Sequence, residues 1–374
     1  MLSFATEEIA SRLGETLGGL VNATFGNAVE LIVSIVALRA GEIEVVQASM
    51  LGSILSNLLL VLGMCFLLGG IYNMRDSEGN GTEQTFSQGT AQTTGSLMAL
   101  ASASMILPAA LYGVLDQQAD EDNKQASILV LSRGTAIVLL SLYVLYLYFA
   151  LRTHKKLFEP ETQSIGASTV GEDEEEHEPL LGPWSAGLVL VVTTLIISVC
   201  ADHMVESIDA LVATGKISKT FIGLILIPIV GNAAEHVTAC VVAIKGKMDL
   251  AMGVAIGSSI QIALLVTPAL VMLGWAIGQP MTLHFETCRS SNPQNLVQWL
   301  TPCPVETVAF ALSVLVTTYT VQDGKSNYLE GAMVRPPFPH PSGTTTNPPQ
   351  LLGLYMIIAL AFWASPADAL GGGH

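Results

Sequence analysis

The sequence predicts an all-α polytopic membrane protein built from two inverted-topology repeats of transmembrane helices. Three observations support this fold class. Of the 374 residues, 51% are hydrophobic and only 12% are charged, whereas soluble domains carry about 25% charged residues. The hydrophobic residues gather in runs long enough to cross a bilayer. Two of these runs repeat one another in the two halves of the chain.

The repeat aligns residues 26–61 with residues 231–266 without a gap, at a constant offset of 205 positions. The identical pairs include Gly26/Gly231, Asn27/Asn232, Ala28/Ala233, Glu30/Glu235, Gly41/Gly246, Gly52/Gly257 and Ser53/Ser258. Small and polar residues therefore recur, while the apolar residues between them drift. Repeated, glycine-interrupted hydrophobic segments of this kind indicate the central site of a membrane transporter.

The apolar runs predict about nine spans. They lie at roughly 18–38, 46–71, 95–115, 127–151, 184–212, 218–244, 250–277, 305–321 and 351–370. The two motifs fall in the first and sixth spans, so five crossings separate them and the repeats run in opposite directions. Residues 1–17 are too polar to match the run at 184–212. We therefore expect one or more N-terminal helices to be missing, which would leave one flank of the Glu30 helix uncovered.

The same pattern divides the chain into two transmembrane halves, residues 1–152 and 183–374, joined by a charged linker at 153–182. The distribution of Lys and Arg on alternating sides favours a cytosolic linker. Two polar inserts, near 288–304 and 334–350, interrupt the second half. The second insert is rich in proline and lacks core-forming residues.

Each repeat places a glutamate inside an apolar helix, and such a group usually marks an ion or proton pathway because it is costly in hydrocarbon. A Gly-Asn pair precedes each glutamate, and a helix that opens there frees carbonyl oxygens for a cation. Hard divalent cations such as calcium take about six to eight oxygen ligands. The expected cation-binding residues are Glu30, Glu235, Asn27, Asn232, Gly26, Gly231, Ser53, Ser258 and Gln261.

These ligand types argue against copper or zinc, which prefer softer ligands. The serines and amides have a second interpretation as groups that join helices in the membrane. The carboxylates suit exchange, since a buried carboxyl takes up a proton when no cation is near and is ionised beside a divalent ion. Competition of protons and cations for two carboxylates is sufficient for antiport. A passive channel and an inert membrane scaffold are the rival functions.

Three further features have open interpretations. His236 follows Glu235, whereas Leu31 stands at the matching position of the first repeat. The imidazole is a candidate proton relay, or a histidine that only packs between helices. Asp202, Glu206 and Asp209 stand at near-helical spacing. They form a candidate acidic vestibule, or simply a solvated helix end.

An acidic run, EDEEEHE, stands within the linker. It consists of Glu172, Asp173, Glu174, Glu175, Glu176 and Glu178 around one histidine. Such runs are typical of solvated tethers, and the functional interpretation is a cytosolic cation collector or regulatory helix. The net charge of −16 also disfavours nucleic acid as a partner.

The segments GNAVELIVSI and GNAAEHVTACVVAIKGKMDLAMGVAIGSSIQIALLV resemble the calcium/proton exchanger family of the cation/calcium exchanger superfamily, in particular its fungal vacuolar members. The resemblance covers most of residues 1–287, 305–333 and 351–370. It implies two inverted five-helix halves, and Glu30 and Glu235 as the central cation-binding glutamates. It also implies a protein that is not an enzyme, needs no cofactor and exchanges calcium for protons across the vacuolar membrane.

Two alternatives stay open within this resemblance. One is a proton-coupled exchanger of manganese or another divalent cation, because manganese accepts similar oxygen ligands. The other is a non-transporting fragment, because the two inserts interrupt family-like sequence in the manner of retained introns.

Overall fold

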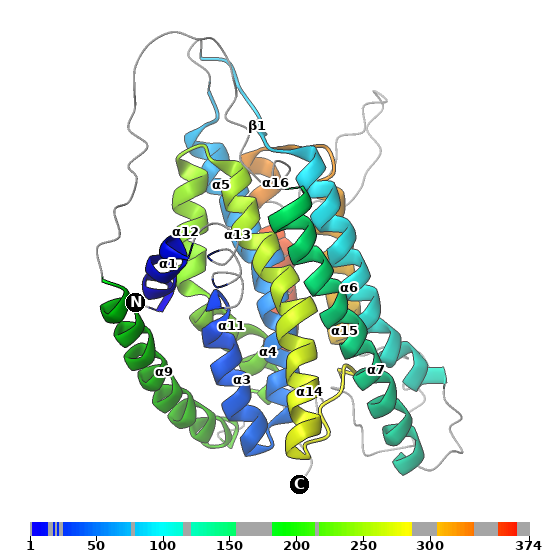
Figure 1. Ribbon diagram of the computed structural model, residues 1–374. Coiled ribbons are helices and arrows are strands. Elements are labelled where there is room, and N and C mark those ends of the chain that lie inside the picture. The colour runs from blue at the N-terminus through cyan, green and yellow to red at the C-terminus, as the bar shows by residue number, and fades with distance from the viewer. Residues whose placement is uncertain are drawn as a thin grey trace.

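The computed structural model is a bundle of long apolar helices (Figure 1). It describes residues 2–13, 18, 21, 25–75, 79–114, 121–154, 182–213, 217–285, 305–332 and 351–364. Within these residues, five continuous helical stretches are long and apolar enough to cross a membrane. They are Ile43–Tyr72, Gln88–Leu111, Gln125–Thr153, Trp184–Val212 and Met248–Ile277. Each falls on one of the predicted spans, and the mostly helical, polytopic fold class is confirmed.

Three predicted spans have other forms in the described residues. The run at 218–244 is a bent pair of helices, Lys219–Gly231 and Ala233–Ile244. The last two runs are the shorter apolar helices Glu306–Thr320 and Leu351–Trp363. The first run is described as a continuous helix only from Ala28 onward.

The two repeats fold alike. In the first, the order is α3 (Ala28–Ala40), α4 (Ile43–Leu55), the π-helical η1 (Ser56–Val61) and α5 (Leu62–Tyr72). In the second, it is α12 (Ala233–Ile244), α13 (Met248–Gln261), the π-helical η4 (Ile262–Val266) and α14 (Thr267–Ile277). α5 lies at the upper end of the bundle and α14 at the lower end (Figure 1), so the repeats are inverted.

The turns between the first two helices of each repeat use equivalent glycines. Gly41 has φ +84° and Gly246 has φ +75°, a left-handed conformation that only glycine adopts without strain. This requirement explains why both glycines recur while the apolar residues around them change.

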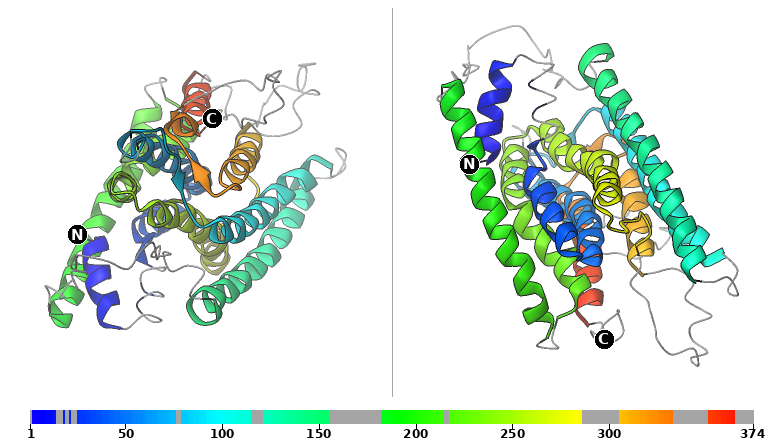
Figure 2. Two further views of the ribbon diagram at one scale, coloured as in Figure 1. Left: turned by 90° about the horizontal axis from the view of Figure 1, so that it is seen from above. Right: turned by 60° about the horizontal axis from the view of Figure 1, so that its bottom comes forward.

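The helix α9 (Pro183–Val212) lies on one side of the repeats, beside α1 (Leu2–Arg12) (Figure 2). Two helices lie on the other side, α6 (Gln88–Val114) and α7 (Glu121–Tyr148) (Figure 2). The π-helical η2 (Phe149–Thr153) continues α7. α9 packs against both α1 and α3. The expectation that one flank of the Glu30 helix is uncovered was therefore wrong, because α9, which follows the linker in the sequence, packs against that helix.

A small two-stranded sheet lies at the upper end of the helix bundle (Figure 1). β1 (Gln84–Thr85) pairs antiparallel with β2 (Lys325–Ser326), with Gln84 opposite Ser326. These strands tie the α5–α6 connection to the segment between α15 (Val305–Thr320) and α16 (Tyr328–Ala332). α16 packs against α5 and against α17 (Leu351–Ala364).

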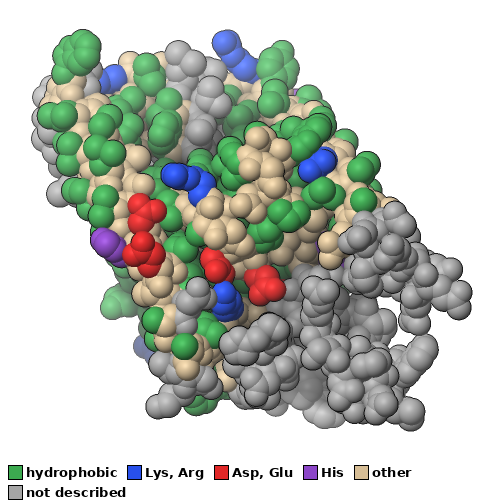
Figure 3. All heavy atoms as spheres, turned by 90° about the horizontal axis from the view of Figure 1, so that it is seen from below, with side chains coloured by type: hydrophobic (Ala, Val, Ile, Leu, Met, Phe, Trp, Pro, Cys, Tyr) green, Lys and Arg blue, Asp and Glu red, His purple; other side chains and the backbone are tan. Residues whose placement is uncertain are grey.

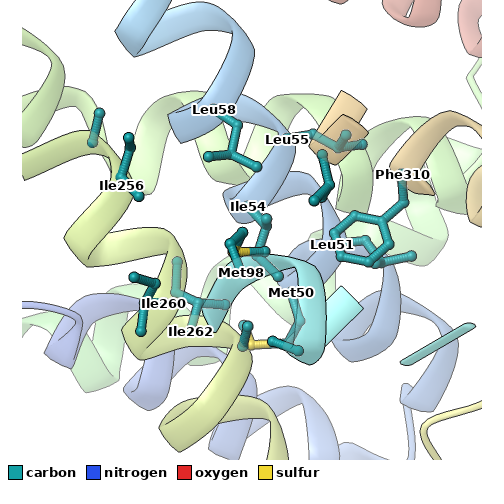
Figure 4. Close-up of a cluster of buried hydrophobic side chains, with 14 of the residues drawn as sticks. Met50, Leu51, Ile54, Leu55, Leu58, Met98, Ile256, Ile260, Ile262 and Phe310 are labelled. Atoms are coloured by element: carbon teal, nitrogen blue, oxygen red, sulfur yellow. The ribbon is translucent and has the colours of Figure 1, made fainter. Parts of the chain in front are cut away.

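The core forms where the two repeats meet. Buried apolar side chains pack together there, and they come from α4, η1, α6, α13, η4 and α15 (Figure 4). The side chains labelled in the figure are Met50, Leu51, Ile54, Leu55, Leu58, Met98, Ile256, Ile260, Ile262 and Phe310. The outer surface of α9 is apolar and exposed, for example at Leu188 and Leu195, as expected of a lipid-facing helix. Charged side chains gather instead at the ends, as on the lower face (Figure 3).

Candidate cation-binding site

Both repeats break at the Gly-Asn pair. In the second, η3 (Ile222–Leu226) and α11 (Ile227–Gly231) lead up to Asn232, and the helix axis bends by 56° before α12. In the first, Asn27 has φ −98° and ψ 29° and immediately precedes α3. The backbone hydrogen bonds from Asn232 N–H to Pro228 O and from His236 N–H to Asn232 O, each at 2.9 Å, continue across the bend in the second repeat.

Glu30 and Glu235 lie in the first turns of the helices that begin at these breaks. The helix dipole favours negative charge at that position. Glu30 is buried at 8% exposure, and a Cβ placed on Gly231 would stand 3.8 Å from its Oε1. The carboxylate of one repeat thus faces the helix break of the other. The two glutamates are also close enough to interact electrostatically.

A hydrogen-bonded network joins the repeats beside the glutamates. Asn27 Nδ2 donates to Gln261 Oε1, and Ser258 Oγ donates to Asn27 Oδ1 at 2.9 Å. Asn57 Nδ2 donates to Ser258 Oγ at 3.0 Å. The structure thus brings together Asn27, Ser258 and Gln261, and it adds Asn57, which the sequence analysis missed.

The equivalent groups on the other side are buried without partners. Asn232 and Ser53 are each 1% exposed. The amide atoms of Asn232, the Ser53 hydroxyl and Glu235 Oε2 have no hydrogen-bond partner among the described residues. Buried polar atoms are rarely left in this state, because each costs about 1–3 kcal/mol when unpaired. A bound ion or water is the usual explanation.

His236 lies one residue beyond Glu235 and is buried. Its Nε2 is 3.2 Å from Ser56 Oγ. His236 therefore contacts a side chain of the first repeat. Its role as a proton relay stays a prediction.

The remaining predicted site residues lie apart from this centre or outside the described residues. Asp202 and Glu206 are exposed on α9, where Glu206 Oε2 lies 3.6 Å from His203 Nδ1. Asp209 belongs to the same helix. Gly26 directly precedes Asn27 at the first break. The acidic run from Glu172 to Glu178 is outside the described residues.

A pocket of about 180 Å³ approaches the site from the upper end. Asp249 at the start of α13 and Gln261 at its end both line it, as do Thr90 and Thr94 of α6. It therefore extends along most of the length of α13 and ends at a member of the hydrogen-bonded network.

Comparisons with known proteins agree with this architecture. A family model described as sodium/calcium exchanger protein matches residues 1–152 and 185–334. The vacuolar calcium ion transporter of Schizosaccharomyces pombe is 45% identical over 367 residues, covering 98% of this chain and 76% of that protein. A Ca²⁺/H⁺ antiporter of Aphanothece halophytica is 40% identical, covering 97% of this chain and 86% of that protein.

Solved structures show the same fold. The structure of native YfkE has a TM-score of 0.68 at 31% identity, covering 97% of this chain and 88% of the other. A crystal structure of the H⁺/Ca²⁺ exchanger CAX has a TM-score of 0.57 at 15% identity, with 96% and 82% covered, and supports the fold alone. The resemblance to calcium/proton exchangers is confirmed, and the chain belongs to the sodium/calcium exchanger protein family.

Proposed function

We propose that this protein is a secondary active antiporter that exchanges calcium for protons through a site formed by Glu30 and Glu235 near the bilayer midplane. The observation that carries the proposal is the position of the Glu30 carboxylate, in one repeat, against the helix break at Gly231 in the other. Two relatives whose names include calcium transport or Ca²⁺/H⁺ antiport cover nearly the whole chain, which supports the same substrates.

The residues around the two glutamates fit a hard divalent cation. Their side chains offer carboxylate, amide and hydroxyl oxygens, which are the ligands that calcium prefers. Asn232 and Ser53 supply oxygens that have no partner among the described residues. Calcium is the transported substrate here, and the proposed exchange requires no resident cofactor.

Exchange follows from competition for the two carboxylates. Without a cation, two nearby carboxylates in a low-dielectric interior are most stable with protons bound. When calcium arrives, its double charge favours the ionised forms and the protons leave. Inverted repeats give the site two equivalent routes, one toward each side of the membrane, so that it opens to the two sides alternately. His236 is the candidate relay for the departing protons.

The membrane we propose is the vacuolar one, because the similar Schizosaccharomyces pombe protein is named a vacuolar calcium ion transporter. Residues 1–152 and 183–374 form the two halves of the antiporter, and the linker at 153–182 lies in the cytosol. Its acidic run would collect cations or regulate the exchanger. Asp202, Glu206 and Asp209 would form an acidic vestibule at the membrane surface.

The test is calcium uptake into sealed vesicles containing the purified full chain under an imposed pH gradient. We expect uptake that stops when a protonophore collapses the gradient. Uptake driven by the calcium gradient alone would identify a channel, and no uptake at all would identify a scaffold or inactive fragment. Competition by manganese with much higher affinity than calcium would make manganese the substrate.

A further inference from the structure

The internal duplication gives each residue of the site network a counterpart in the other repeat. At the constant offset, Asn27 matches Asn232, Ser258 matches Ser53, Gln261 matches Ser56 and Ile262 matches Asn57. If the hydrogen bonding followed the sequence symmetry, both asparagines would have the same environment. The structure shows that they do not.

Both polar atoms of the Asn27 side-chain amide have hydrogen-bond partners. Its Nδ2 donates to Gln261 and its Oδ1 accepts from Ser258. Ser258 in turn accepts from Asn57. Turning the Asn27 oxygen toward a cation would break these bonds, and a buried group left without its partner costs about 1–3 kcal/mol. The network therefore fixes the orientation of Asn27 and ties α13 to the first repeat.

Two sequence differences remove this network from the opposite side. Ser56 replaces the long amide of Gln261, and its hydroxyl is already in contact with His236. Ile262 replaces Asn57 and has no side-chain hydrogen-bonding group. Asn232 and Ser53 are consequently buried without partners among the described residues. Their oxygens remain available to a ligand in the centre of the molecule.

We propose that the two halves of the site have different roles, with Asn232 and Ser53 as direct calcium ligands, and Asn27 and Gln261 as positioning residues. This inference rests on the proposed exchange function. The Asn57–Ser258–Asn27 chain, with the Asn27 bond to Gln261, fixes Asn27 directly before the helix that carries Glu30, which orients the start of that helix before calcium arrives. Orientation in advance reduces the ordering cost of binding.

The experiment compares the two asparagines through their aspartate variants. Asn→Asp keeps a side-chain oxygen but removes the Nδ2 donor. Asn232→Asp retains the ligand atom, so we expect an apparent KM for calcium no higher than in the wild type. Asn27→Asp loses the bond to Gln261, so we expect a lower maximal rate with a KM within about twofold of the wild type. The measurement is the initial rate of proton-driven calcium uptake.

Leucine variants complete the comparison. Asn232→Leu removes the ligand, and losing one bond to a charged group raises the apparent KM about tenfold or more. Gln261→Leu removes the acceptor of Asn27 Nδ2, so it lowers the maximal rate without that rise in KM. Size-exclusion profiles of the purified variants report correct folding.

Two results would overturn the division of roles. One is an equal rise in KM in Asn27→Leu and Asn232→Leu, which would make both asparagines ligands. The other is a wild-type KM in Asn232→Leu, which would show that Asn232 is not a calcium ligand. An inactive wild-type protein would instead overturn the exchange function itself.

Discussion

Gly52 and Gly257 occupy equivalent positions in the two repeats but have opposite surroundings. A Cβ added at Gly52 would collide with the backbone carbonyl of Leu224 and with the ring of Pro228, whereas a Cβ at Gly257 would meet nothing within 4 Å. Gly52 therefore permits the close crossing of α4 and η3. Gly257 instead lines the pocket beside α13. One glycine is required by packing, and its counterpart is not.

The first prediction follows from this difference. Gly52→Ala should destabilise the protein by about 1–3 kcal/mol or more, because the added methyl group would collide with the Leu224 backbone, which cannot rotate away as a side chain can. Gly257→Ala should be neutral or slightly stabilising, since alanine favours a helix by about 1 kcal/mol over glycine. The two melting temperatures in detergent report the effect. Equal destabilisation by both variants would contradict the asymmetry.

A second prediction concerns Gln47, a buried amide on α4. Its Nε2 donates to the backbone oxygens of Thr282 and His284, each at 2.9 Å, and so ties α4 to the segment that follows α14. Gln47→Leu should lower stability by about 1–3 kcal/mol, because these carbonyls lose their donor.

The chain supplies a matched control for this variant. Met252 stands at the equivalent position of the second repeat, and Met252→Leu conserves volume and should cost less than about 1.5 kcal/mol. Thermal unfolding of the two variants, followed side by side, measures the difference. A Gln47→Leu protein as stable as Met252→Leu would show that the bonds contribute little.

The third prediction is a pH dependence at Glu330, on α16 outside the membrane-spanning helices. Burial raises the pKa of Glu330 to about 7, and the like charges of Asp323 and Glu83 add to the effect. Because its pKa is raised in the folded protein, its contribution to stability is fully present below its ordinary pKa and is lost as pH rises through about 7. Wild-type stability should therefore fall over this range.

Glu330→Gln removes this titration and keeps an oxygen that can accept from Asn327 Nδ2. The variant should match the wild type in melting temperature at about pH 5 and exceed it at about pH 8. An identical difference between the two proteins at both pH values would mean that Glu330 does not titrate in this range.

The sequence predicted the features that depend on local backbone chemistry. The glycine turns at Gly41 and Gly246 and the helix breaks at Asn27 and Asn232 recur in both repeats, because each needs a particular residue type at a particular place. The recurring Gly-Asn pairs predicted the helix breaks, whereas the turns at Gly41 and Gly246 were recognised in the structure. The two glutamates were conspicuous for a similar reason, since a charge within an apolar helix has few purely structural explanations.

Features that depend on long-range packing could not be predicted in this way. Asn57 matches Ile262, so a comparison that looks for identical pairs does not find it. The sequence did contain a signal for this residue, because an amide within the apolar run SNLLLV suggests a functional side chain. The hydrogen bonds that distinguish Asn27 from Asn232 depend on which helices meet. The packing of α9 on α3 was equally hidden, because the first part of α9 is apolar on all sides and so does not indicate its neighbour.

The central claim is that Glu30 and Glu235 together bind the exchanged cation. The most direct measurement is proton-driven calcium uptake by vesicles containing Glu30→Gln or Glu235→Gln, with Glu83→Gln as the control. Glu83 forms an exposed pair with Lys325, so its loss should matter little to calcium uptake. We expect either site variant to abolish uptake and the control to retain it. Wild-type uptake by either Glu30→Gln or Glu235→Gln would contradict a shared two-carboxylate site.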